Sequence, residues 1–140
     1  MRGLVAILLF FVVFVSCKKE YNDNPDRFKH GVFEIPAGKG YSKTIITRVD
    51  SIQIEEYTRT ISISNDSVVT EKEVKHIDTL YITWKNNFAY YLQMKNPKTD
   101  LDEDPIFVQI NKVTNNSYDF TAKIGYSKFK QTGTLYISEE

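Results

Sequence analysis

Cys17 has the most distinctive chemistry in the chain, because it is the only cysteine among 140 residues. A single thiol cannot form a disulfide within the chain. It follows the apolar run Gly3–Val15 and Ser16, and Lys18 and Lys19 come directly after it. A thiol at the end of an apolar leader is a candidate for covalent modification rather than for packing in a core.

The tetrapeptide Phe14-Val15-Ser16-Cys17 resembles a lipobox, the signal at which a cysteine thiol receives a diacylglyceryl group before the leader is cleaved. Ser16 fits the small residue of that signal, and Phe14 stands where Leu is usual. The resemblance implies lipidation of Cys17 and cleavage between Ser16 and Cys17. Each buried methylene contributes about 0.8 kcal/mol, so two or more acyl chains anchor a protein stably. The alternative is an ordinary secretory signal that leaves Cys17 unmodified.

The histidines and the acidic cluster do not predict a metal site. His30 and His76 are the only histidines and are not at ligand spacing, whereas zinc needs three or four ligands. Carboxylates at positions 100, 102, 103 and 104 have the chemistry to bind Ca²⁺, but Pro105 interrupts the cluster where a calcium loop would continue. We therefore interpret both features as solvated polar positions.

No catalytic constellation is recognisable in the sequence. Glu55 and Glu56 are adjacent, so on a strand they face opposite sides and cannot act as a paired acid and base. No Gly-x-Ser-x-Gly elbow is present, and neither histidine lies in a known nucleophile motif. We expect no catalytic residues, no metal and no cofactor, and hence a protein that is not an enzyme.

Residues 1–16 are predicted to be a lipoprotein signal peptide. Arg2 precedes 13 apolar or small residues, a length typical of a secretory signal. A spanning helix needs roughly 20 apolar residues to cross a ~30 Å hydrocarbon layer. Residues 17–27 are polar, contain Pro25 and read as a flexible tether that follows the lipidated Cys17. The folded domain is expected over residues 28–140.

Period-two alternation of apolar and polar residues runs through most of this domain. Such alternation predicts half-buried strands. In one run we expect Ile45, Thr47 and Val49 to share the apolar face. In the next run Ile52 and Ile54 form the corresponding face. The runs lie at residues 32–35, 45–49, 52–55, 60–64, 80–85, 88–94, 106–111, 118–124 and 134–138.

Turn-forming residues separate these runs and indicate short loops. Asn65-Asp66, Asn86-Asn87 and Asn115-Asn116 tolerate the positive φ of tight hairpins. Residues 67–76 fit a short helix or a polar edge strand, and we favour the strand. The sequence predicts an all-β fold, an antiparallel meander of about eight or nine strands. We expect a small lipocalin-like barrel, with a β-sandwich as the alternative.

The chain is rich in aromatic residues, with nine Phe, nine Tyr and one Trp. These side chains either fill a small barrel completely or line a cavity for an apolar ligand. We favour filling, and the hollow barrel is the alternative. The candidate core or cavity aromatics are Trp84, Phe88, Tyr90, Phe107, Tyr118 and Phe120.

Six segments carry a family resemblance: residues 28–34, 48–54, 82–84, 91–98, 116–120 and 131–135. In this order they resemble a group of small flavobacterial lipoproteins of the Bacteroidota, which have no established activity. Many of those proteins bear the label "DNA topoisomerase IV", but this chain lacks the size and the Gly-rich phosphate loop that such an enzyme needs. The opening Gly31-x-Phe33 also resembles the first strand of lipocalin-type barrels, which usually have Trp in place of Phe33.

The charge balance argues against nucleic-acid binding. The 18 basic and 18 acidic residues cancel, and loss of Arg2 with the leader leaves 17 against 18, a net charge of −1. Phosphate backbones are bound by clustered Lys and Arg.

We therefore expect a lipoprotein of the cell envelope, held by its lipid in a membrane, with the outer membrane as first choice. Its β domain would be a non-enzymatic module for binding or for interaction with a protein partner. The alternatives are a lipocalin-like carrier of a small apolar ligand and a hydrolase with an unrecognised site.

Overall fold

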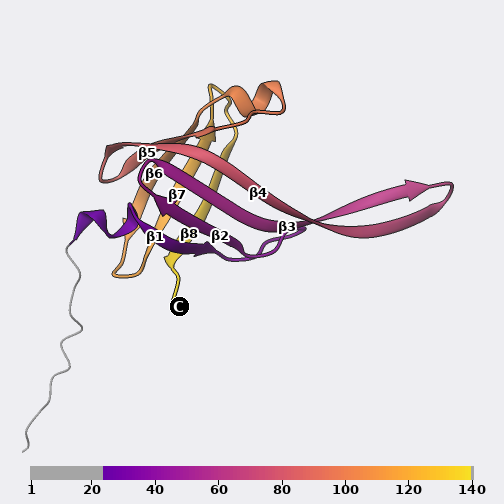
Figure 1. Ribbon diagram of the computed structural model, residues 1–140, viewed down its shortest axis with the longest axis horizontal. Helices are drawn as coiled ribbons and strands as arrows, with labels where there is room; N and C mark the ends of the chain where they lie inside the picture. The colour runs from indigo at the N-terminus through magenta and orange to yellow at the C-terminus, as the bar shows by residue number, and fades with distance from the viewer. Residues whose placement is uncertain (1–23, 140) are drawn as a thin grey trace, which may run out of the picture.

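A computed structural model describes residues 24–139, which form a closed barrel of eight antiparallel strands joined in sequence order (Figure 1). This confirms the expected all-β meander and its lipocalin-like closure, and it excludes the β-sandwich. The elements are η1 (Pro25–Phe28), β1 (Gly31–Ile35), β2 (Thr44–Val49), β3 (Ile52–Asn65), β4 (Val68–Asn86), β5 (Ala89–Met94), η2 (Asp100–Glu103), β6 (Ile106–Val113), β7 (Ser117–Ile124) and β8 (Lys130–Ile137).

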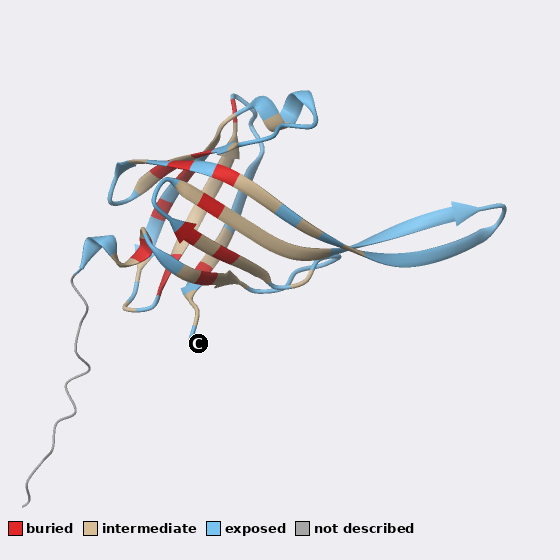
Figure 2. Ribbon diagram, in the orientation of Figure 1, coloured by how far each residue is buried: buried red, intermediate tan, exposed pale blue. Residues whose placement is uncertain are grey.

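The barrel closes where β1 pairs with β8, through Phe33 with Ile137 and Glu34 with Tyr136. Alternate residues of each strand point inward, as expected for a sheet that is buried on one face. In β6, for example, Val108 and Ile110 are buried. Buried residues therefore gather inside the barrel, and exposed residues cover its outside (Figure 2).

The 3₁₀ helix η1 covers one end of the barrel. Asn24 caps it by accepting a hydrogen bond from the backbone N–H of Asp26, and Pro25 stands in its first turn, where a missing N–H costs nothing. Phe28 is 4% exposed, and its ring meets the ring of Tyr118 edge to face at 5.0 Å. Residues 25–27, which the sequence assigned to the tether, thus belong to an ordered element.

The signal peptide, Ser16 and Cys17 lie outside the described residues, so their predicted roles stay predictions. Among residues 24–139, no helix has the length and apolar character needed to cross a membrane.

Strands β3 and β4 extend far beyond the barrel as a two-stranded arm (Figure 1). We call residues 59–73 the arm; every one of them is exposed. A two-residue turn with positive φ at Asp66 and Ser67 joins its strands, in the conformation that tight hairpins require. The predicted runs 52–55 and 60–64 are therefore one continuous strand, and residues 67–76 contain the favoured strand, not a helix.

Candidate functional site

A buried arginine lies inside the barrel, at the end covered by η1. Arg48 on β2 is 1% exposed. Its guanidinium donates to the backbone oxygen of Phe28 at 2.8 Å, to Tyr90 Oη at 2.9 Å and to Tyr118 Oη at 3.0 Å. The two tyrosine hydroxyls are also hydrogen-bonded to each other at 2.8 Å. The interior of this end is thus a hydrogen-bonded polar network, not a purely apolar core.

Aromatic rings surround the same guanidinium. Its carbon lies 4.9 Å from the ring centroid of Tyr90, 5.2 Å from that of Phe33 and 5.6 Å from that of Trp84. These distances fall within the range of cation–π attraction. Because arginine does not lose its proton in proteins, the barrel interior holds a permanent positive charge that these rings and oxygens stabilise.

Gln53 on β3 connects Arg48 to an acidic side chain. Its Oε1 accepts from Arg48 Nε at 2.7 Å, and its Nε2 donates to Glu55 Oε1 at 2.6 Å. Gln53 is 1% exposed, so this amide is fixed between cation and carboxylate. The arginine and Glu55 are therefore coupled through an intervening side chain and not through a direct ion pair.

A cavity of about 590 Å³ occupies the rest of the interior and opens at the end opposite η1. Its walls are mostly aliphatic and aromatic. Polar groups come from β3 and from β8: Gln53, Glu55, Tyr57, Arg59, Gln131, Thr132 and Thr134. The mouth is bordered by Pro36 and Tyr41 before β2 and by Phe129 before β8. The apolar wall includes Ile35, Ile46, Tyr90, Leu92, Ile106, Val108, Phe120, Ala122, Ile124 and Leu135. The barrel is therefore filled at its closed end and open to this cavity at the other, whereas the sequence led us to favour complete filling.

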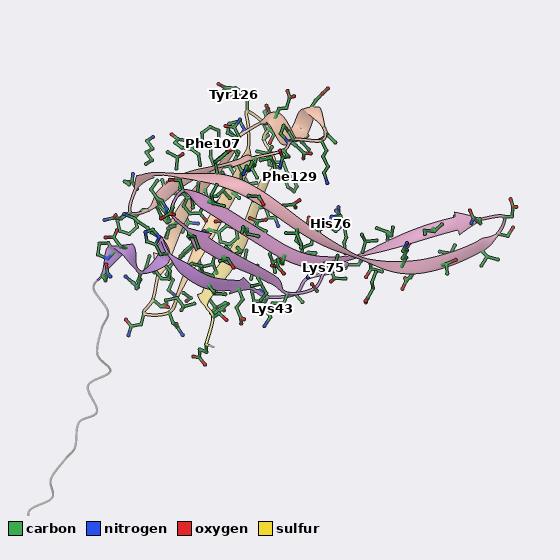
Figure 3. All side chains as sticks on the ribbon, in the orientation of Figure 1. Lys43, Lys75, His76, Phe107, Tyr126 and Phe129 are labelled. Atoms are coloured by element: carbon green, nitrogen blue, oxygen red, sulfur yellow. The ribbon has the colours of Figure 1, made fainter. Side chains whose placement is uncertain are left out.

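Two carboxylates face each other on the cavity side of the sheet. Glu55 on β3 is the direct cross-strand partner of Asp78 on β4. Directly opposed residues project to the same face, about 4.5–5.5 Å apart at Cβ. Tyr57 Oη donates to Asp78 Oδ2 at 3.3 Å, and the ring of Tyr57 stacks on His76 at 5.2 Å. His76 lies at the base of the arm (Figure 3).

Burial raises the pKa of two side chains at this point, Glu55 and Tyr57. Burial raises the pKa of Glu55; the Gln53 hydrogen bond opposes that shift and the charge of Asp78 adds to it, so the net pKa is raised. Burial also raises the pKa of Tyr57, and the charge of Asp78 adds to that effect. Neither Glu55 nor Asp78 forms a salt bridge within the described residues. A carboxylate therefore sits in an apolar cavity without a direct cationic partner.

Four of the six predicted core or cavity aromatics lie in the interior. Tyr90 and Tyr118 are buried, and Trp84 and Phe120 are partly buried against the core. Tyr90 and Phe120 line the cavity.

Phe88 and Phe107 do not belong to the core or the cavity, and the prediction for them was wrong. Phe88 is 55% exposed because it lies in the turn before β5, where strand alternation has not begun. Phe107 is 37% exposed because it occupies the outward phase of β6, between Ile106 and Val108. Its ring instead meets that of Tyr91 at 4.9 Å on the outside of the barrel.

The other groups considered from the sequence are not brought together. Glu56 points to the opposite face from Glu55 and forms a salt bridge of 3.5 Å with Lys75. Asp102 caps η2, where hydrogen bonds from the backbone N–H of Lys98 and from Thr99 lower its pKa. Residues 24–139 contain no group of three or more His, Cys, Asp or Glu that could hold a metal ion.

Sequence reasoning missed the inward-facing polar residues because it assigned the wrong phase to β2 and β3. It placed Val49 on the apolar face, but Val49 is 57% exposed, and Ile46 and Arg48 face inward instead. On β3 the inward phase is Gln53 and Glu55. The β2 sequence left the phase open, because Ile45 and Ile46 are adjacent and an apolar residue therefore stands in either phase. That ambiguity was the one available sign that Arg48 could face inward.

We compared the chain with known protein families, curated proteins and solved structures. No protein-family model, no curated protein and no solved structure matches the chain.

Proposed function

We propose that the β domain binds a small, mostly apolar molecule in its barrel and that Cys17 holds it at a membrane as an envelope lipoprotein. The observation that carries the binding proposal is the cavity of about 590 Å³, which lies within the 300–1,000 Å³ typical of ligand pockets. Apolar walls with a few fixed polar groups are typical of such pockets as well. The resemblance to flavobacterial lipoproteins agrees with the anchor but carries no ligand.

The position of η1, where the described chain begins, supports the combination of anchor and open barrel. The described chain enters at η1, on the closed end, and the cavity opens at the other end. Asn24 lies seven positions after Cys17, and seven residue steps span at most about 25 Å. A lipid on Cys17 would therefore hold the closed end towards the membrane and leave the mouth directed away from it.

A neutral fluorescent probe tests the cavity. We expect N-phenyl-1-naphthylamine to bind the mature protein one to one, with a rise in its fluorescence. Ala122→Trp places an indole in the cavity wall and should weaken binding at least about tenfold, equivalent to about 1.4 kcal/mol. Ala122→Leu should give a smaller loss.

The matched control is Thr121→Trp, which adds the same side chain on the outer face of β7. Both variants are checked for an intact thermal unfolding transition. Equal probe binding by Ala122→Trp and wild type would contradict binding in the barrel, and so would absence of binding to wild type.

A second candidate function, interaction with a protein partner, is favoured by the arm. Arg59 and Thr60 still bridge to the loop at residues 40–41, but beyond them β3 and β4 pair only with each other, so each has an open edge of backbone N–H and C=O groups. Open edges accept an extended segment as an added strand. One face of the arm combines Ile61 and Ile63 with Lys72, whereas the other carries Glu71 and Glu73. An extended polypeptide with apolar and acidic side chains would complement the first face.

Site-specific photocrosslinking in cells tests this second function. A photoreactive residue in place of Ile63 should give one discrete crosslinked partner. The control position is Tyr126, which is fully exposed but lies in the loop before β8. Identical crosslinking from both positions, or none from Ile63, would contradict a role of the arm in partner binding.

A further inference from the structure

The cavity has a chemical preference that its volume alone does not reveal. Its wall is apolar around most of the barrel, yet Glu55 places a carboxylate on it. Only one hydrogen bond to that carboxylate is found within residues 24–139, from Gln53 Nε2 to Oε1. The Glu55 side chain is half-buried and borders the cavity.

A second carboxylate strengthens the local negative potential. Asp78 stands directly across from Glu55, and like charges in this position destabilise a sheet unless a counter-charge is present. The hydroxyl of Tyr57 reaches Asp78 but brings no charge. The barrel thus contains a repulsive pair beside an open volume that could hold a cation.

Neither of the two nearest cations, Arg48 and Arg59, forms a salt bridge with Glu55. Arg48 is saturated by Gln53, Phe28, Tyr90 and Tyr118 and reaches Glu55 only through Gln53. Arg59 lies two positions beyond Tyr57 on β3, in the exposed arm at the mouth. No salt bridge within the described residues reaches Glu55, so the ammonium group of a molecule that enters the cavity would be its first direct cationic partner.

An organic amine fits this arrangement better than a metal ion. No set of three or more metal-ligating side chains gathers within the described residues. Walls that include Tyr90, Phe120 and Leu92 suit an apolar body, and aromatic faces attract an ammonium group. A carboxylate is the usual partner of a primary ammonium, because charged hydrogen bonds are stronger than neutral ones.

We propose that the barrel binds a primary amine with an apolar body, whose ammonium group is recognised by Glu55 with Asp78 beside it. This proposal rests on ligand binding in the barrel and specifies the class of ligand. The ammonium lies against β3 at the depth of Glu55, and the apolar body contacts the wall formed by β5, β6 and β7.

A matched series of probes separates the two proposals. Octylamine, octanol and octanoate share one apolar chain and differ only in the head group. Isothermal titration of the mature protein should give the tightest binding for octylamine, with octanol at least about tenfold weaker and octanoate weaker still. Glu55→Gln should weaken octylamine binding at least about tenfold and leave octanol binding unchanged.

The control variant is Glu56→Gln, which removes the same charge one residue away but on the outer face. It should bind all three probes as wild type does. Asp78→Asn should weaken octylamine binding less than Glu55→Gln, because Tyr57 already occupies Asp78. Thermal unfolding confirms that each variant is folded.

The outcomes distinguish the ligand class from the ligand site. Octanol bound as tightly as octylamine, or an amine preference that survives Glu55→Gln, would overturn the amine proposal while leaving the barrel as a binding site. Failure of all three probes to bind would overturn both proposals.

Discussion

At the residue scale, Arg48 distinguishes this barrel from one closed by apolar packing alone. Its guanidinium joins the backbone of η1, two tyrosines and Gln53 at the closed end. We expect Arg48→Met to lower the free energy of unfolding by about 3 kcal/mol, because each buried acceptor left unsatisfied costs about 1–3 kcal/mol. Urea unfolding measures the change.

The comparison for Arg48→Met is Arg59→Met. Arg59 is exposed at the mouth, so its substitution should change the free energy of unfolding by no more than about 0.5 kcal/mol. Equal effects of the two variants would show that the buried network does not stabilise the fold.

Glu55 predicts a dependence of stability on pH. Its folded-state pKa is raised, first by burial, so between the ordinary glutamate pKa of 4.5 and the folded value the folded state binds more protons than the unfolded state. The free energy of unfolding must then fall as pH rises through that interval. The charged or titratable groups that face Glu55 are Asp78 on β4, Arg48 on β2 and Tyr57 on β3.

Urea unfolding of wild type and Glu55→Gln at pH 4, 6 and 8 tests this linkage. Because Gln cannot ionise, the wild type should lose stability relative to Glu55→Gln as the pH rises from 4 to 8. A constant difference at all three pH values would contradict the assignment of a raised pKa to Glu55.

At the scale of elements, η1 closes the barrel through one side chain. We expect Phe28→Ala to destabilise the protein by about 3–5 kcal/mol, because it removes a buried ring that packs on Tyr118. Phe88→Ala is the control: its ring is 55% exposed, and its loss should cost about 0.5 kcal/mol or less. A reversed order in thermal and urea unfolding would contradict the placement of both rings.

The same scale shows what alternation in the sequence can and cannot predict. It identified the strands and the antiparallel meander, because each outward-facing row is polar enough to mark a period of two. It failed on the phase of β2 and β3, since the inward row there is Arg48, Gln53 and Glu55. Polar residues that satisfy one another inside a barrel reverse the pattern on which phase is assigned.

The arm shows a second limit of sequence reasoning. The predicted runs 52–55 and 60–64 left residues 56–59 unassigned, but the chain continues through them as β3. Cross-strand pairing with β4 holds this region extended. Local composition therefore could not reveal that two predicted strands are one, nor that they leave the barrel.

At the scale of the whole molecule, η1 and the cavity mouth lie at opposite ends of the barrel, and the proposed anchor at Cys17 precedes η1 in the sequence. We expect wild type to incorporate labelled palmitate and to fractionate with membranes, whereas Cys17→Ala should do neither, because it lacks the thiol that would be acylated. The folded domain should be unaffected, since residue 17 precedes every described element. Labelling of Cys17→Ala equal to that of wild type would contradict the anchor.

The shape of the molecule also fits a division of roles. The closed end carries η1 and the buried network, and the arm leaves the barrel at the other end, where the cavity opens. Figure 2 shows the arm as an exposed extension of the barrel.

Native mass spectrometry of the protein, purified from its source cells in mild detergent, tests most directly whether the barrel carries a small molecule. We predict a bound species, of a size that a cavity of about 590 Å³ can hold, on the wild type and on Thr121→Trp but not on Ala122→Trp. Wild-type protein that carries only its covalent lipid, or an adduct that persists in Ala122→Trp, would contradict it.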